Sequence, residues 1–476
     1  MAEVSTGPLI DLTRPSRLHV VGVGGPGMSA IATALAGMGH TVSGSDLKDL
    51  PILARLAAQG VQVRVGHDAS HLDGVDAVAI STAIPEANLE VVTARERGVP
   101  VLRRAEILAA IAATRRTIAV SGTHGKTTTA SMLALVLVEA GLRPPFIIGG
   151  DLHEIGSGAV WDAGEWFVVE ADESDGTFLE IAAERVVVTN VEADHLDFFG
   201  DLAAVEAAFD RFLGEAPGPN VACADDPCAA RLAARHGAAT YGTAEGADYR
   251  IVVASTGREG SAFTVRHGGD VIAEVVLPVP GLHNVRNATA ALVAGHLVGA
   301  PIDAAVRALA RYAGVARRYE QRGSAAGVTF VDDYAHNPGK VRAVVDTACR
   351  TGFDRVVVVF QPHRYSRTAA LWRDFGDSFV GADLVVVTDV YGAGEAPQPG
   401  VTGKLVVDAV LSSHPWSRVA WLPHHDDVLG YLSAELRPGD LCLTLGAGDI
   451  TAWPDEIMAR LRHRSAAAGR TAEPQP

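Results

Sequence analysis

The chain has 476 residues, of which 48% are hydrophobic and 20% are charged. This length predicts two or three folded domains, and this composition excludes a disordered chain. The 56 acidic and 40 basic residues give a net charge of −16, which argues against a protein that coats nucleic acid. An anionic ligand must therefore be held by local clusters of basic side chains.

The four cysteines are too few and too scattered for a disulfide framework, and no Cys-x-x-Cys pair suggests a zinc site. We expect these thiols to be reduced and buried. No stretch approaches the ~18–20 uninterrupted apolar residues of a membrane span. Acidic residues precede any apolar run at the N-terminus, so we expect no secretory signal and predict a cytoplasmic protein without membrane insertion.

The first segment alternates apolar strands with helical stretches. A strand at 18–23 leads through a glycine-rich turn into a helix at 28–38, and further short strands follow. After residue 115 the pattern begins again, with a strand at 117–120, a second glycine-rich turn and a helix at 126–140. Strands that alternate with helices are typical of parallel sheets built from βαβ units.

The rest of the chain continues this alternation. Buried strands are expected at 166–170 and 185–189, with a small β-rich elaboration at 238–270, and a third round of alternation begins near residue 317. We therefore predict an α/β protein with three domains, at residues 1–115, 116–316 and 317–476.

The first glycine-rich turn fits the pattern G-x-G-x-x-G through Gly22, Gly24 and Gly27. Glycines let the backbone approach a diphosphate, and the helix N-terminus that follows offers free N–H groups. Asp46 ends the next strand, where an acid would bind ribose hydroxyls. Alone, this pattern favours an NAD-binding domain, with another nucleotide diphosphate or a packing turn without ligand as alternatives.

The second glycine-rich turn, SGTHGKTTT at 121–129, also lies between a strand and a helix. A Gly-Lys-Thr at a helix start cradles phosphates, places an ammonium on them and offers a hydroxyl to Mg²⁺. The loop is shorter than a full P-loop, because Val120 stands where the first glycine would be. It nevertheless predicts a nucleoside triphosphate site.

Acidic residues follow two strands of the middle segment. Glu170, Asp172, Glu173 and Asp175 follow one strand, and His195 lies after the next. Such crowded acids repel one another, which predicts a nearby cation, and Mg²⁺ prefers carboxylate ligands over histidine. Glu170 is therefore the favoured metal ligand, and a solvated acidic loop is the alternative.

Basic side chains follow strands of the last segment. Tyr334 and His336 lie after one strand, and His363, Arg364 and Arg367 form a dense basic cluster after the next. A guanidinium binds a carboxylate or a phosphate through two hydrogen bonds. This cluster predicts an anion site.

Nine motifs, in order along nearly the whole chain, resemble the Mur ligases of peptidoglycan synthesis. They are GVGGPGMS (22–29), SGTHGKTTT (121–129), VEADESDGTF (169–178), TNVEADHLD (189–197), PGLHNVRNA (280–288), RRYE (317–320), DDYAHNP (332–338), FQPHRYSRT (360–368) and GAGDI (446–450). The resemblance implies a Rossmann-like domain for a UDP-sugar, a central P-loop-type ATPase domain, and a C-terminal Rossmann-like domain for an amino acid.

The resemblance also implies the reaction, an ATP-dependent ligation in cell-wall biogenesis that supports cell shape and division. ATP would phosphorylate the lactoyl carboxylate of UDP-N-acetylmuramate, and the amine of L-alanine would attack the acyl phosphate. Because a carboxylate is a poor electrophile, catalysis would consist of positioning and charge neutralisation. ATP and Mg²⁺ (or Mn²⁺) are the implied cofactors, and no nucleic acid partner is expected.

The resemblance assigns roles to individual residues. The catalytic ones are Lys126, His195, Arg318 and His336, and the metal ligands are Thr127, Glu170 and His195. The ATP-binding ones are Gly122, Thr123, His124, Gly125, Lys126, Thr127, Thr128, His283, Asn284, Asn287, Arg318 and Asp333. The UDP-sugar residues are Gly24, Gly25, Asp46, Ser81 and Thr82. The amino-acid residues are Tyr334, His336, His363, Arg364 and Arg367.

Two features separate this chain from other members of the family. Asn337 stands where the family usually has a second histidine, which leaves its role open. No lysine lies between residues 201 and 230, so we expect no carbamylated lysine, as in the members that add alanine. The alternatives are a ligase of the same family that recycles murein tripeptide and, from a different class, an NAD-dependent oxidoreductase.

Overall fold

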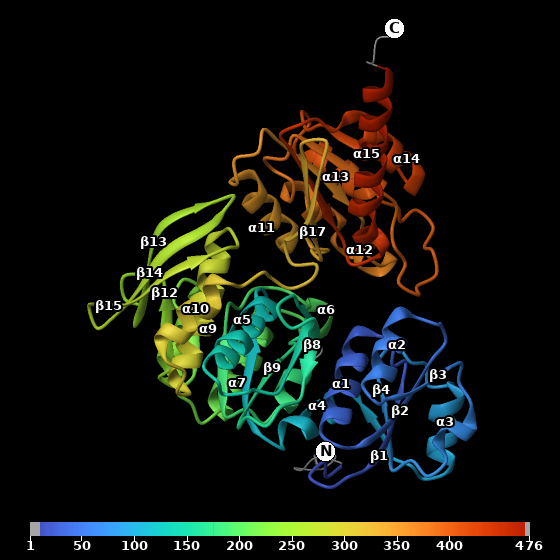
Figure 1. Cartoon of the computed structure of the whole chain (residues 1–476), viewed down its shortest axis with the longest axis vertical. Helices are drawn as coiled ribbons and strands as arrows, with labels where there is room; N and C mark the ends of the chain where they lie inside the picture. Colours follow the sequence, from blue (N-terminus) through green and yellow to red (C-terminus); the bar gives the residue numbers. More distant parts are fainter. Residues whose placement is uncertain (1–9, 175, 472–476) are drawn as a thin grey trace. The chain divides into compact units, whose positions relative to one another are not determined.

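Three separate β-sheets organise the computed structural model, which describes residues 10–174 and 176–471 except the side chains of 196, 197 and 465–471 (Figure 1). The chain divides into two compact units, one formed by Met1–Ser255 with Gly260–Val315 and the other by Thr256–Glu259 with Ala316–Pro476. The first unit contains two sheets and the second contains one. Within the described part of the chain, no helix is long and apolar enough to cross a membrane.

The first sheet is parallel throughout, in the order β3-β2-β1-β4-β5. Its strands are β1 (Arg17–Val21), β2 (Thr41–Asp46), β3 (Gln62–Val65), β4 (Ala77–Ile80) and β5 (Val101–Arg103). One face is covered by α1 (Pro26–Gly37), α2 (Pro51–Ala58) and α4 (Arg104–Ala112), and the other by α3 (Leu89–Glu96) and the 3₁₀ helix η1 (Ala69–Leu72). The strand order reverses between β1 and β4, and such a switch point opens a ligand crevice.

The second sheet has ten strands in the order β15-β14-β13-β12-β11-β10-β6-β9-β7-β8. Its parallel centre is flanked by antiparallel pairs, β14 with β15 and β7 with β8. The strands are β6 (Arg116–Ser121), β7 (Phe146–Leu152), β8 (Ser157–Val160), β9 (Trp166–Glu170), β10 (Arg185–Val188), β11 (Val221–Cys223), β12 (Ala239–Gly242), β13 (Tyr249–Gly257), β14 (Gly260–His267) and β15 (Asp270–Leu277). The β-rich elaboration expected at 238–270 is confirmed, because β12, β13 and β14 extend this sheet.

Helices cover both faces of the second sheet. The residues of α5, α9 and α10 share one buried apolar cluster with the sheet, and those of α7 and α8 share another. The helices are α5 (Lys126–Glu139), α6 (Leu196–Phe199), α7 (Leu202–Glu215), α8 (Pro227–His236), α9 (Leu282–Leu297), α10 (Ile302–Ala310) and the 3₁₀ helix η2 (Thr177–Glu180). Because both faces are covered, the central strands are continuous apolar runs such as RVVV at 185–188.

The third sheet has the order β16-β17-β21-β18-β19-β20, parallel except for β16. Its strands are β16 (Glu320–Ala325), β17 (Val328–Asp333), β18 (Arg355–Phe360), β19 (Leu384–Val387), β20 (Val419–Trp421) and β21 (Asp440–Leu445). One face packs on α11 (Pro338–Cys349), α13 (Lys404–Ser413) and η3 (Trp372–Asp377), and the other on α14 (His425–Glu435) and α15 (Trp453–Thr471). Short helices α12 (Tyr365–Leu371) and η4 (Asp449–Ala452) follow β18 and β21.

All four cysteines are free thiols, as predicted from their spacing. Cys223, Cys228 and Cys442 are buried, but Cys349 is partly exposed near the end of α11, so the expectation of burial is wrong for that residue. Burial raises the pKa of the Cys349 thiol, which disfavours its reactive thiolate form.

Candidate functional site

Three predicted site loops meet at the carboxyl edge of the second sheet. Strand β6 lies between β9 and β10 and is parallel to both, so the segments that follow these strands emerge side by side. The phosphate loop, which is the glycine-rich turn at 121–129, follows β6. The acidic cluster that begins at Glu170 follows β9, and the segment with His195 follows β10. The sheet thus brings together residues that the sequence separates by up to about 70 positions.

The phosphate loop is held closed by a residue that the sequence analysis did not single out, Asn190. Its side chain accepts a hydrogen bond from the N–H of His124 at 2.8 Å and donates one to the His124 carbonyl at 3.0 Å. Gly122 and Gly125 take positive φ angles of 137° and 80°, which L side chains rarely adopt. Helix α5 then begins at Lys126, and its first N–H groups form an anion site.

Lys126 is buried in an ion pair. Its ammonium lies 2.9 and 2.7 Å from the two carboxylate oxygens of Glu173 and donates to the Gly122 carbonyl at 2.7 Å. Burial by itself would lower the pKa of Lys126. The nearby Glu173 and Asp172 carboxylates raise this pKa by more than burial lowers it, so the lysine stays charged. Lys126 is therefore one cation that stabilises the acidic cluster. Asp175, the last acid predicted for this cluster, lies outside the described residues.

The predicted metal ligands Thr127 and Glu170 lie together. The Thr127 hydroxyl donates to one Glu170 oxygen at 2.8 Å, and the other oxygen accepts the Gly149 N–H at 2.6 Å. His195 lies in the same cluster, with Nε2 3.9 Å from Glu173 and 3.7 Å from Asp194. A hydroxyl and a carboxylate at the start of α5 are donors that suit Mg²⁺.

The ATP-binding residues predicted at His283, Asn284 and Asn287 lie on α9. A Cβ atom at Gly125 would lie 2.5 Å from Oδ1 of Asn287, so this amide contacts the phosphate loop. Asn284 is also buried, but its amide donates to the Pro280 carbonyl at 2.8 Å, and His283 is exposed. Of these three predicted residues, the structure places Asn287 directly against the loop.

The predicted UDP-sugar residues line the switch point of the first sheet. Oδ2 of Asp46 accepts the Gly24 N–H at 3.0 Å, and Oδ1 accepts the Lys48 N–H at 3.2 Å. Asp46 thus shapes the glycine turn, and Gly25 precedes the first residue of α1. Ser81 and Thr82 follow β4 on the other side of the switch point.

In the third sheet, β21 lies between β17 and β18, so three further loops are adjacent. Arg317, which precedes β16, links two of them. Its carbonyl accepts the Tyr334 N–H at 2.9 Å, and its guanidinium donates to the carbonyls of Gly446 and Gly448 at 2.8 and 3.2 Å. The side chain of Asp332 is fully buried and accepts hydrogen bonds from Thr444 and Thr451, both at 2.7 Å. Sequence analysis missed Arg317 and Asp332 as supports of this site, although both lie inside motifs that it recognised.

The histidines in and beside the basic cluster of the third domain, His363 and His336, are uncharged. Burial, with help from Arg367 and Arg364, lowers the pKa of His363 to about 4, and burial and Arg367 hold the pKa of His336 well below its ordinary value. At neutral pH, Nδ1 of His363 therefore accepts the hydrogen bond from Arg367, at 3.0 Å. The positive charge of the cluster resides on Arg364 and Arg367, as an anion site requires. Tyr391, whose ring lies parallel to His363 at 5.8 Å, was not anticipated.

Three more residues of the recognised motifs lie at the carboxyl end of β17 or against the loop that follows it. Asn337 caps α11, because its side chain accepts the Lys340 N–H at 2.9 Å, which gives a structural role to the position where the family usually has histidine. The buried carboxylate of Asp333 accepts the Tyr319 and Ala335 N–H groups, both at 2.7 Å. The guanidinium of Arg318 lies 5.2 Å from the Tyr334 ring.

The fold and the sites define the class of protein: an α/β enzyme that binds a nucleoside triphosphate in one domain and other ligands in separate domains. Comparison with known families then places the chain. Residues 17–116 match the Mur ligase family catalytic domain, residues 120–295 the Mur ligase middle domain, and residues 317–448 the Mur ligase glutamate ligase domain. The chain belongs to the Mur ligase family.

Similar proteins align with this chain over nearly its full length. A UDP-N-acetylmuramate–L-alanine ligase from Rubrobacter xylanophilus is 46% identical over 94% of this chain and 100% of its own. One from Kineococcus radiotolerans is 48% identical over 96% and 99%. The crystal structure of UDP-N-acetylmuramate–alanine ligase from Thermotoga maritima is 29% identical, with a TM-score of 0.78 over 95% of this chain and 100% of that one.

Proposed function

We propose that the chain joins L-alanine to the lactoyl carboxylate of UDP-N-acetylmuramate, with hydrolysis of ATP to ADP and phosphate. It is an ATP-dependent, amide-bond-forming ligase of peptidoglycan synthesis. The observation that carries this function is the high identity, over nearly the whole chain, to ligases that are named for this reaction. Its two nucleotide substrates, ATP and a UDP-sugar, place the reaction in the cytoplasm.

The phosphate loop supports the first step of the reaction. The Lys126 ammonium and the N–H groups at the start of α5 neutralise charge as the phosphoryl group moves to the lactoyl carboxylate. This transfer gives the carboxylate carbon a good leaving group. Asn190 holds the backbone of the loop, and Glu173 holds its lysine. Such preorganisation lowers the cost of positioning.

The third domain supports the second step, in which the amine of L-alanine attacks the acyl phosphate and phosphate leaves. Arg364 and Arg367 supply the positive charge for the carboxylate of the amino acid. His336 is uncharged, and its Nδ1–H donates to the Tyr334 carbonyl at 2.8 Å, so the lone pair is on Nε2. We assign to Nε2 of His336 the proton lost by the attacking amine.

Thr127, Glu170 and His195 would hold Mg²⁺ or Mn²⁺. The adjacent hydroxyl and carboxylate of the first two residues fit a hard cation, and His195 adds a less usual ligand. When bound, the ion neutralises charge on phosphate oxygens. The carboxylate of Glu173 is already paired with Lys126, which leaves Glu170 as the favoured carboxylate ligand.

Replacing Glu170 with glutamine is expected to raise the Mg²⁺ concentration for half-maximal activity at least ~10-fold, because the site loses an anionic ligand while its volume is kept. A metal titration of ATP turnover measures this. Asp162→Asn, which alters an exposed ion pair with Arg143, is the control and should titrate like the parent. If the Glu170→Gln curve overlays the parent's, Glu170 is not a ligand.

Replacing Arg367 with lysine is expected to raise the KM for L-alanine roughly 10- to 100-fold, because a lost charge-assisted hydrogen bond costs about 1.5–3 kcal/mol. The KM for ATP should stay unchanged. Steady-state kinetics with each substrate varied in turn measure both constants. Arg373→Lys is the control, since that guanidinium lies over the Trp372 ring on η3 and has no assigned role in the site. A raised KM for ATP alone would assign Arg367 to the nucleotide.

The function is tested by ATP consumption with UDP-N-acetylmuramate and either L-alanine or murein tripeptide. Turnover with L-alanine is expected, and turnover only with the tripeptide would identify the recycling ligase instead. Calorimetry of the full chain with UDP-N-acetylmuramate and with NAD tests the first glycine turn. Binding of NAD alone would favour the oxidoreductase.

A further inference from the structure

A second cluster of titratable side chains lies in the first domain, on the face of the sheet that α3 and η1 cover. Its centre is Glu90 on α3, whose carboxylate is fully buried. That carboxylate contacts the Ser45 hydroxyl at 2.6 Å, Nδ1 of His67 at 2.8 Å and Nδ1 of His71 at 2.7 Å. The backbone N–H of Asp68 also donates to this carboxylate, at 3.3 Å. Burial raises the pKa of Glu90, but His19, Ser45 and His71 together lower it to about 2, so an anion is buried here at neutral pH.

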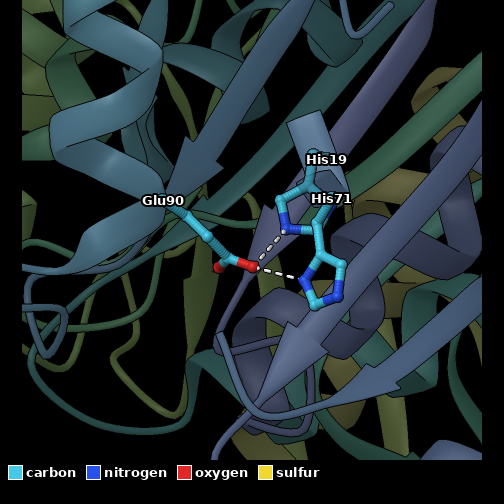
Figure 2. Close-up of side chains that lie close together, drawn as sticks. All are labelled: His19, His71 and Glu90. Atoms are coloured by element: carbon cyan, nitrogen blue, oxygen red, sulfur yellow. Dashed lines mark hydrogen bonds and ion pairs between the residues drawn. The ribbon is translucent and has the colours of Figure 1, made fainter. Parts of the chain in front are cut away.

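His19, on β1, faces the same carboxylate oxygen as His71 (Figure 2). Its ring is fully buried, and Nδ1 lies 2.9 Å from the Ser43 hydroxyl oxygen. In the tautomer with Nδ1–H, the Ser43 oxygen accepts this hydrogen from His19 and the Ser43 hydroxyl donates to the Leu18 carbonyl at 3.4 Å. In this tautomer the lone pair of the neutral His19 ring is on Nε2.

This arrangement places two hydrogen-bond acceptors against each other. Nε2 of His19 lies 3.5 Å from Oε1 of Glu90, and it has no hydrogen-bond partner among the described residues. Two facing lone pairs in a buried site are unfavourable unless a proton or a metal cation lies between them. A metal cation bound by both atoms would remove this repulsion.

We propose that His19, His71 and Glu90 form a Zn²⁺ site. Their ligand atoms lie within 4.8 Å of one another. The 3.5 Å between Nε2 of His19 and Oε1 of Glu90 matches the ~3.3 Å edge of a tetrahedral site with metal–ligand bonds of about 2.0–2.1 Å. His71 exchanges its hydrogen bond to Glu90 for a bond to the metal, and Ser43 orients His19 from behind, as second-layer partners of metal-bound histidines do.

The surroundings favour zinc and leave space for a fourth ligand. A cavity of about 260 Å³ is lined by His19, Ser43 and His71, so water can complete the tetrahedron. Two imidazoles select Zn²⁺ over Mg²⁺, which distinguishes this site from the oxygen donors of Thr127 and Glu170. The ion would tie together β1, η1 and α3, the elements that carry the three ligands.

The test is a Co²⁺ titration of the full-length protein, stripped with a chelator and kept in millimolar Mg²⁺ to occupy the hard-cation site. We expect one equivalent to give the visible absorption of tetrahedral Co²⁺ and to be displaced by Zn²⁺. His71→Ala and Glu90→Gln should each weaken binding at least ~10-fold. Zn²⁺ should raise the melting temperature of the parent but not of His71→Ala.

The control is His414→Ala, which removes a surface histidine paired with Asp377 at 2.8 Å and should leave binding intact. Glu90→Gln alters a fully buried group. If the Glu90→Gln variant does not fold, His71→Ala decides the outcome, because the His71 imidazole is 14% exposed. The proposal is overturned if no tetrahedral Co²⁺ spectrum forms, or if His71→Ala binds like the parent. The buried contact is then a histidine–carboxylate pair without metal.

Discussion

Replacing Lys126 with alanine is expected to lower the kcat of ligation at least ~100-fold, because the phosphate loop loses the ammonium that neutralises the moving phosphoryl group. Binding of UDP-N-acetylmuramate should survive, since the first domain supplies that site. Single-turnover kinetics and calorimetry measure the two effects separately. Near-normal turnover in the variant would remove this loop from the catalytic machinery.

The Lys126 variant also leaves a charge unpaired. Glu173 has a side chain only 3% exposed, and removing the partner from a buried ion pair costs about 3–5 kcal/mol. The double variant Lys126→Ala/Glu173→Gln should therefore recover stability in denaturant unfolding but not activity. Lys404→Ala, which breaks an exposed pair with Asp408, serves as the control and should change neither. Recovery of activity in the double variant would show that Lys126 acts only by neutralising Glu173.

Replacing Gly122 with alanine is expected to reduce turnover by a similar factor, for a steric reason. The new Cβ would lie 2.1 Å from the Thr189 hydroxyl oxygen and 3.0 Å from the backbone N and O of Asn190, which cannot move without opening the loop. The residue also has a φ of 137°, which alanine rarely adopts. The KM for ATP should rise and the melting temperature should fall.

Gly141→Ala separates backbone strain from steric clash. Gly141 also has a positive φ, 74°, but no atom lies within 4 Å of a Cβ built there. That variant should lose only about 1–2 kcal/mol of stability and keep its KM for ATP. If the two variants behave alike, strain alone accounts for the Gly122 effect and the contact with Asn190 does not matter.

Much of the fold could be predicted from apolar runs. The strands at 77–80, 166–170 and 185–188 are continuous hydrophobic segments, because both faces of their sheets are covered by helices. Strand β7 was missed since FIIGGDL contains two glycines, which weaken a strand signal. Strand β16 was missed because EQRGSA is polar and forms a sheet edge, where little apolar surface is buried.

The glycine turn at 22–27 shows where local pattern is insufficient. By itself it favoured NAD, because any diphosphate uses the same helix N-terminus and the same close backbone approach. The other eight motifs in family order outweighed that pattern, and the match of all three domains to the Mur ligase family agrees with them. Asp46 was predicted to bind a ribose, but both of its oxygens hold backbone N–H groups of its own loops. Its contact with the substrate stays a prediction.

The amino-acid sequence by itself predicted which residues carry the chemistry, because Gly-Lys-Thr at a helix start, acids after a strand and paired arginines are local signals. Only the tertiary structure decided which of them meet. Lys126 pairs with Glu173 because β6 and β9 are adjacent, and Arg317 reaches Gly446 because β21 lies beside β17. His19, His71 and Glu90 gave no sequence signal, since their spacing follows no motif. They converge because η1 and α3 pack on one face of the sheet that contains β1, and strand order is a property of the whole domain.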